Sequence, residues 1–167
     1  FGEGITIVGN KIVQLTWRTN IGFVYEKSTF KKLREFNYPT EGWGLTFDGT
    51  HLIMTDGSEN MYFMDTANYT VLKKIQVYDN NGPIEKLNEL EYVDGYVYAN
   101  IYTTDFIVKI DPRTGKVIKR WEFPDMLEES DITEQTDVLN GIAYNKDTKR
   151  FYITGKYWPK MFEIAFK

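Results

Sequence analysis

The sequence contains no cysteine and a single histidine, His51. Without cysteine there is no disulfide, no thiolate nucleophile and no Cys-ligated metal, and one histidine does not make a metal cluster by itself. No apolar run approaches the roughly 18 residues that are needed to cross a bilayer, and residues 1–10 lack the layout of a signal peptide. A thiol enzyme and a helical membrane span are therefore excluded.

An excess of charge is also missing. The formal net charge is -4, and the Lys and Arg residues are scattered rather than gathered into the basic stripe that a phosphate backbone requires. Nucleic acid is therefore not an expected partner. Apolar material is abundant instead, because 42% of the 167 residues are hydrophobic and 16% are aromatic, which is enough for one globular domain.

An internal repeat organises the chain. Four similar segments open successive units at intervals of roughly 40 to 50 residues, the spacing typical of propeller blades. They are Glu3-Gly4-Ile5-Thr6, Trp43-Gly44-Leu45-Thr46, Glu89-Leu90-Glu91-Tyr92 and Asn140-Gly141-Ile142-Ala143. Each is followed by a turn, a second strand rich in β-branched and aromatic residues and a third strand, and in three units by a fourth. The pattern predicts an all-β propeller of four-stranded antiparallel blades.

The repeats define one domain over residues 1–167. Their approximate limits are 1–39, 40–82, 83–124 and 137–167, and the last repeat lacks an outer strand. A propeller is closed by the radial packing of its blades, so these units are not expected to close a ring. We therefore expect an incomplete propeller: either the natural protein carries a further unit, mostly upstream of Phe1, or the chain is nicked or truncated. The one stretch with helical character, residues 125–136, lies in a long acidic loop.

Propeller topology brings the start of each innermost strand and the end of the second strand to one rim. The residues at these positions are Glu3, Trp43, Asn88, Glu89, Asn140, Trp17, Asp56, Tyr102 and Lys156. Taken singly, each has an ordinary explanation, such as a solvated charge, a turn residue or an aromatic that packs between blades. Their convergence suits a small polar ligand in an aromatic cage better than a metal or a nucleotide.

Six runs of residues resemble the motifs of the five-bladed glutaminyl cyclases of plants and bacteria, the type typified by the papaya enzyme. They are residues 1–6 (FGEGIT), 14–18 (QLTWR), 41–46 (EGWGLT), 87–91 (LNELE), 139–143 (LNGIA) and 154–159 (TGKYWP). The resemblance implies a glutaminyl-peptide cyclotransferase, an acyltransferase that closes the N-terminal glutamine of peptides or proteins into pyroglutamate and releases ammonia. It also implies catalysis without a metal or other cofactor, an extracytoplasmic location and a monomer.

The resemblance also assigns roles within the site. Glu3 matches the catalytic carboxylate, Asn88 and Trp43 match the side-chain donors around the reacting amide, and Lys156 matches the lysine at the channel mouth. The substrate-binding candidates are Phe1, Trp17 and Tyr102, which match the apolar walls, together with Asn140 from the rim.

Two features depart from the family pattern. Tyr102 stands where tryptophan is common, so we expect a smaller and wetter wall at this position. The family's first-blade motif, Phe-Thr-Gln-Gly, would precede Phe1, and its glutamine belongs to the site. Activity of the isolated chain therefore does not follow from the resemblance.

Two other interpretations stay open. The first is a non-catalytic propeller that binds peptides or proteins on its rim, with the same aromatic residues as anchors. The second is a structural module in which the acidic run 128–131 binds calcium, although such a run is more often a solvated surface. A structural calcium or zinc ion remains an open alternative in either case.

Overall fold

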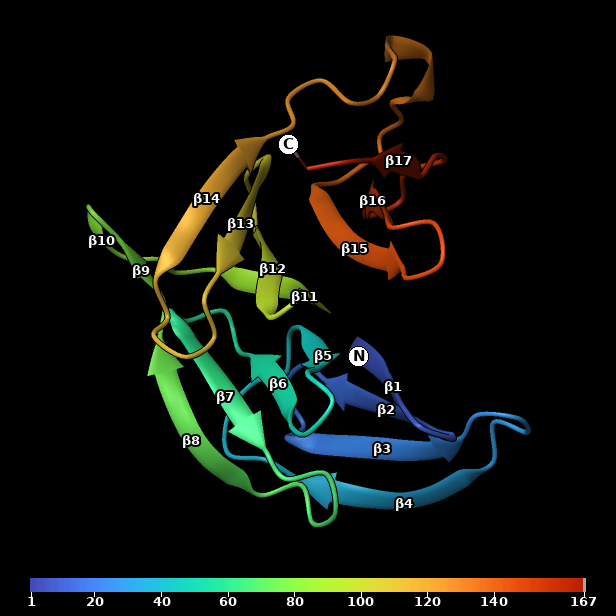
Figure 1. The fold of residues 1–167 in the computed structure, drawn as a ribbon. Helices are drawn as coiled ribbons and strands as arrows, with labels where there is room; N and C mark the ends of the chain where they lie inside the picture. The colour runs from blue at the N-terminus through green and yellow to red at the C-terminus, as the bar shows by residue number, and fades with distance from the viewer. Residues whose placement is uncertain (167) are drawn as a thin grey trace.

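Short apolar strands separated by tight turns fold into four antiparallel sheets, whose strands pair in chain order (Figure 1). The structure is a computed structural model that describes residues 1–166. The first blade contains β1 (Gly2–Val8), β2 (Lys11–Thr16), β3 (Ile21–Glu26) and β4 (Lys32–Asn37). The second contains β5 (Leu45–Phe47), β6 (Leu52–Thr55), β7 (Asn60–Met64) and β8 (Val71–Gln76).

The third blade contains β11 (Leu87–Val93), β12 (Tyr96–Ile101), β13 (Phe106–Ile110) and β14 (Val117–Glu122). The fourth has three described strands, β15 (Leu139–Asn145), β16 (Arg150–Gly155) and β17 (Phe162–Ile164). The turn between β11 and β12 shows why the hairpins are tight. Asp94 and Gly95 both have positive φ, 50° and 85°, as a two-residue type I′ turn requires. The predicted propeller of antiparallel blades is confirmed.

Two small elements lie between the blades. A two-stranded ribbon, β9 (Tyr78–Asp79) with β10 (Gly82–Pro83), projects from the link between the second and third blades (Figure 1). The acidic loop contains one short 3-10 turn, η1 (Glu129–Asp131), in the stretch whose sequence has helical character. The ribbon was not predicted from the sequence, because two-residue strands are too short to produce an alternating pattern.

The apolar core is divided among the gaps between consecutive blades. One buried cluster joins the first and second blades, another joins the second and third, and another joins the third and fourth. Strand β6 shows how alternation produces this division, because Leu52 and Met54 pack towards the first blade while Ile53 packs towards the third. Both faces of β6 are therefore buried, and each blade depends on its neighbours for its core.

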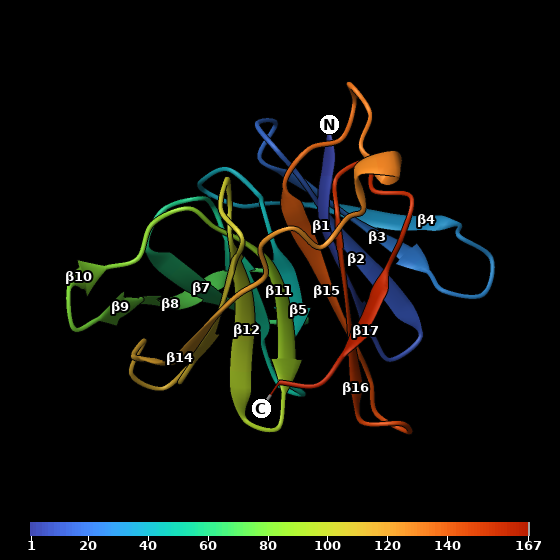
Figure 2. The same ribbon diagram turned by 90° about the horizontal axis from the view of Figure 1, so that it is seen from above.

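The innermost strands β1, β5, β11 and β15 are neighbours in that order around the propeller axis. β1, β11 and β15 run in the same direction, so their first residues lie at one end of the molecule (Figure 2). Near the axis, the backbones of neighbouring blades approach each other closely. A Cβ atom at Gly44 would lie 1.9 Å from the carbonyl oxygen of Asn88, so only glycine fits there. This packing positions the rim described next.

Candidate active site

Irregular pairing marks the start of three innermost strands. The register of β1 with β2, of β11 with β12 and of β15 with β16 shifts within the first residues of the inner strand. Glu3, Asn88 and Asn140 lie within these three shifts. A β-bulge re-aims the side chain at the extra residue, and bulges are common next to active sites. The blade openings therefore combine a repeated sequence with a local distortion that redirects a polar side chain.

Seven of the eight predicted site residues line one small pocket at the rim, with a volume of about 190 Å³. They are Phe1, Glu3, Trp17, Trp43, Asn88, Tyr102 and Lys156. Asn140 is the exception, because it lies in an adjoining hollow of about 350 Å³ that also contains Tyr157. Phe1, Glu3, Trp43, Asn88 and Lys156 border both spaces. The two spaces therefore form a continuous surface across the rim.

Asp56 is a rim position that does not join the pocket. Its carboxylate accepts hydrogen bonds from the hydroxyls of Thr40 at 2.7 Å, Ser58 at 2.5 Å and Tyr62 at 2.9 Å. These contacts tie the second blade to the preceding loop. Asp56 thus has a structural role in the second blade and does not contribute to the pocket.

The carboxylate of Glu3 and the ammonium of Lys156 set the electrostatics of the pocket. Partial burial raises the pKa of Glu3 above its ordinary value of 4.5, and the positive charge of Lys156 acts in the opposite direction. The Lys156 Nζ atom also lies 5.3 Å from the centre of the Tyr102 ring. A carboxylate with a raised pKa beside an ammonium group is a suitable arrangement for proton transfer.

The two tryptophans of the pocket share one hydrogen-bond acceptor, Glu41. The indole Nε1 of Trp17 donates to Glu41 Oε2 at 2.8 Å, and that of Trp43 donates to the same oxygen at 2.9 Å. The single N–H of Trp43 is therefore engaged with Glu41 in this structure, and its role as a donor to the reacting amide stays a prediction. Its ring remains in the pocket wall and packs edge-to-face on Tyr102, with centroids 5.5 Å apart.

Thr55 holds the backbone of Asn88 from the neighbouring blade. Its buried hydroxyl donates to the Asn88 carbonyl oxygen at 2.8 Å and accepts from the Gly44 amide at 3.0 Å. The Asn88 residue is only 4% exposed, although its side chain lines the pocket. Neither Thr55 nor Glu41 was predicted from the sequence. Thr55 ends a second strand and Glu41 opens the 41–46 motif, but the sequence does not indicate the contacts that either residue makes.

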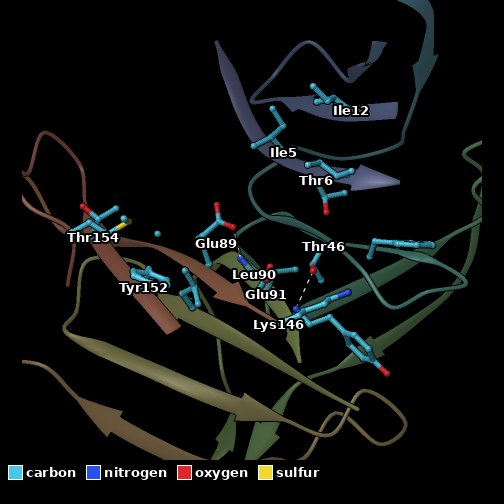
Figure 3. Close-up of a pocket in the computed structure, with 17 residues that line it drawn as sticks. Ile5, Thr6, Ile12, Thr46, Glu89, Leu90, Glu91, Lys146, Tyr152 and Thr154 are labelled. Carbon is cyan, nitrogen blue, oxygen red and sulfur yellow. Dashed lines mark hydrogen bonds between the residues drawn. The ribbon is translucent and has the colours of Figure 1, made fainter. Parts of the chain in front are cut away.

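Behind the rim, the central channel is lined by carboxyl groups as well as apolar side chains (Figure 3). Glu89 borders both this cavity, of about 680 Å³, and the hollow at the rim. Burial raises the pKa of Glu89 to about 8 and that of Glu91 to about 7. The Glu89 amide donates to Asn140 Oδ1 at 3.3 Å, which links the third and fourth blade openings.

The acidic loop is held by an ion pair. Lys160 Nζ lies 2.5 Å from Asp131 Oδ2 and 3.8 Å from Glu128 Oε2. Within residues 1–166, no three His, Asp or Glu side chains are grouped as metal ligands. Over the same residues, the chain also forms no helix with the length and apolarity required to cross a membrane.

Known proteins resemble the chain in sequence and in fold. The chain is 37% identical to the glutaminyl-peptide cyclotransferase of Arabidopsis thaliana over 171 residues, covering all of this chain and 53% of that protein. It therefore spans about half the length of this curated relative. The crystal structure of Myxococcus xanthus glutaminyl cyclase superposes with a TM-score of 0.91 at 32% identity, over 99% of this chain and 72% of that one.

More distant structures share the fold alone. Hydrazine synthase of Kuenenia stuttgartiensis matches with a TM-score of 0.62 at 14% identity, over 92% of this chain and 43% of that one. The family described as glutamine cyclotransferase matches residues 1–166, which is nearly the whole sequence and includes every residue of the rim pocket. The chain therefore belongs to the glutamine cyclotransferase family.

Proposed function

We propose that the protein is a glutaminyl-peptide cyclotransferase, which converts the N-terminal glutamine of peptides or proteins to pyroglutamate and releases ammonia. The observation that carries this proposal is the rim pocket, in which one carboxylate, one carboxamide and one ammonium group meet among aromatic walls. The Arabidopsis relative bears this activity in its name. A pocket of about 190 Å³ is of a size to enclose one amino-acid side chain rather than a long segment.

The reaction joins two groups of the same residue. The α-amine attacks the side-chain carbonyl carbon, a new C–N bond closes the five-membered ring, and the C–N bond to the amide nitrogen breaks to release ammonia. Because the reactants are already tethered, the pocket contributes mainly by holding the reactive rotamer. The rings of Trp17, Trp43 and Tyr102 would enclose the substrate side chain in this conformation.

Glu3 carries the proton in this proposal. It accepts a proton from the attacking amine, whose ordinary pKa is roughly 7.7 to 8.0, and later donates a proton to the departing amide nitrogen. Partial burial raises the pKa of Glu3, which makes it a stronger base than a solvated carboxylate and a usable acid in the second step. One side chain thereby serves both proton transfers.

Negative charge develops on the carbonyl oxygen as the carbon becomes tetrahedral. The Asn88 carboxamide and the Lys156 ammonium are the pocket donors suited to stabilise it, because the indole N–H groups of Trp17 and Trp43 bind Glu41. The Asn88 backbone is anchored to Thr55, so the residue that carries the carboxamide is held in place before the substrate binds.

The test uses the protein expressed from its complete reading frame. It is incubated with the dipeptide Gln-Gly in a buffer that contains EDTA to chelate metal ions. Ammonia is assayed, and the peptide product is identified by mass spectrometry. We expect ammonia and a pyroglutamyl product in equal amounts, without an added metal. Binding of the dipeptide without release of ammonia would instead identify a non-catalytic propeller that binds peptides on its rim. The proposed extracytoplasmic location and monomeric state are separate predictions of family membership.

A further inference from the structure

Glu41 belongs to the loop between β4 and β5, outside the pocket wall, yet it contacts two residues that form the wall. Trp17 follows the second strand of the first blade, and Trp43 precedes the innermost strand of the second blade. One oxygen of Glu41 accepts the indole N–H of both, at 2.8 Å and 2.9 Å. A single carboxylate therefore links rings that are contributed by different blades.

Arg18 supports the same arrangement from outside. Its Nε lies 3.5 Å from Glu41 Oε1, and its guanidinium carbon lies 3.8 Å from the centre of the Trp17 ring. The two carboxylate oxygens thus have different partners, one shared by the indoles and one facing Arg18. Hydrogen bonding, above all from Trp43, holds the pKa of Glu41 below its ordinary value. The acceptor is therefore ionised at neutral pH, which strengthens its hydrogen bonds.

The Trp43 ring is confined by its neighbours. A Cβ atom at Gly57 would approach this ring to 2.6 Å, so the absence of a side chain at Gly57 leaves the space in which the ring lies. On another side the ring meets Tyr102 at an interplanar angle of 80°. The hydrogen bond to Glu41 fixes the remaining freedom, which is rotation of the indole about its side-chain bonds.

We propose that Glu41 is a positioning residue that holds Trp17 and Trp43 as one rigid wall and thereby determines the affinity for the glutaminyl side chain. This inference rests on the proposed function. A wall that is fixed before the substrate arrives loses little conformational entropy on binding, whereas loose indoles would have to be ordered by the substrate. Loss of Glu41 should therefore weaken substrate binding more than it slows the chemical step.

Three variants test the role, with L-glutaminamide as substrate. Glu41→Ala removes the shared acceptor, Glu41→Gln retains an acceptor oxygen without the charge, and Glu35→Ala is the control. Glu35 is an exposed carboxylate of the first blade that pairs with Lys32 at 2.6 Å, away from the pocket. The loss of two indole hydrogen bonds should raise KM about tenfold in Glu41→Ala. The kcat should change less, KM should recover largely in Glu41→Gln, and Glu35→Ala should match the wild type.

Near-ultraviolet circular dichroism provides a readout that does not need turnover. We expect Glu41→Ala to lose part of the tryptophan signal while its melting temperature stays close to that of the wild type, and Glu41→Gln to regain it. An unchanged KM and tryptophan signal in Glu41→Ala would overturn the inference, as would a Gln variant as impaired as the Ala variant. If the wild type itself releases no ammonia, the proposed function fails, and the tryptophan signal alone decides the role of Glu41.

Discussion

Glu3 is partly buried and interacts with the ammonium group of Lys156, and both features shift the pKa on which its proposed role as acid and base depends. Replacement by glutamine keeps the shape of the side chain and removes its proton-transfer ability. Since positioned acid–base groups contribute about 10²- to 10⁴-fold, we expect Glu3→Gln to lower kcat by at least about a hundredfold. The ammonia assay measures the loss, and circular dichroism checks that the fold is retained. Wild-type turnover by this variant would remove Glu3 from the mechanism.

The position of Lys156 predicts a change in pH dependence. Its ammonium lowers the pKa of Glu3 against the effect of burial, so Lys156→Gln should raise that pKa. The base form of Glu3 exists only above its pKa, and the acid limb of kcat/KM should therefore move to higher pH. Lys146→Gln is the matched control, because Lys146 faces the central channel and acts on Glu91. An acid limb that stays in place in Lys156→Gln, or moves equally in both variants, would contradict the electrostatic coupling.

The strands themselves were largely predictable from the sequence, and parts of the site were not. Alternating residues, two-residue turns and repeated openings identify blades, and propeller topology then places Glu3, Asn88 and Lys156 on one rim. Glu41 escaped prediction because its contacts depend on how the loop before β5 folds back over the two indoles. The hydrogen bond from Trp43 to Glu41 was not predictable for the same reason, since the sequence does not show which acceptor an indole N–H binds.

Strand ends also connect the blades. Two buried threonines of the second blade bridge to the third: Thr55 reaches the Asn88 carbonyl at the rim, and Thr46 accepts from the Tyr92 amide at 3.0 Å along the channel. Replacing either with valine keeps the side-chain shape and removes the partner of a backbone group, which is buried at Asn88 and partly buried at Tyr92. Each change should lower the free energy of unfolding by about 1 to 3 kcal/mol.

Only one of these bridges holds a pocket residue. Thr55→Val should therefore also lower kcat for glutamine cyclisation, whereas Thr46→Val should lose stability alone. Thr55→Ser retains the hydroxyl and should recover activity. Urea unfolding and ammonia release, measured on the same preparations, separate the two effects. Equal kcat losses in Thr55→Val and Thr46→Val would mean that stability, not the position of Asn88, limits activity.

At the scale of the whole molecule, the apolar core lies between the blades. The geometry of the site therefore depends on the stability of the interfaces between blades. The rim pocket takes residues from all four blades, while each apolar cluster joins only two consecutive blades. Repeated units that bury their cores against neighbours derive their stability from those interfaces. The geometry of the pocket is therefore maintained only while every interface between the four blades is intact.

This dependence predicts that a destabilising substitution at one interface also lowers the stability of a distant interface. Leu52 is fully buried between the first and second blades, and Leu52→Ala should cost about 2 to 5 kcal/mol. Trp121 and Trp158 belong to the cluster between the third and fourth blades, far along the chain from this change. If the blades unfold together, the fluorescence of these tryptophans should shift to lower urea concentration by the same amount as the circular dichroism signal. To isolate their fluorescence, the measurement is made with Trp17 and Trp43 replaced by phenylalanine. A distant transition that keeps its original midpoint would show that the blades unfold independently, and that the pocket can lose one wall while the others persist.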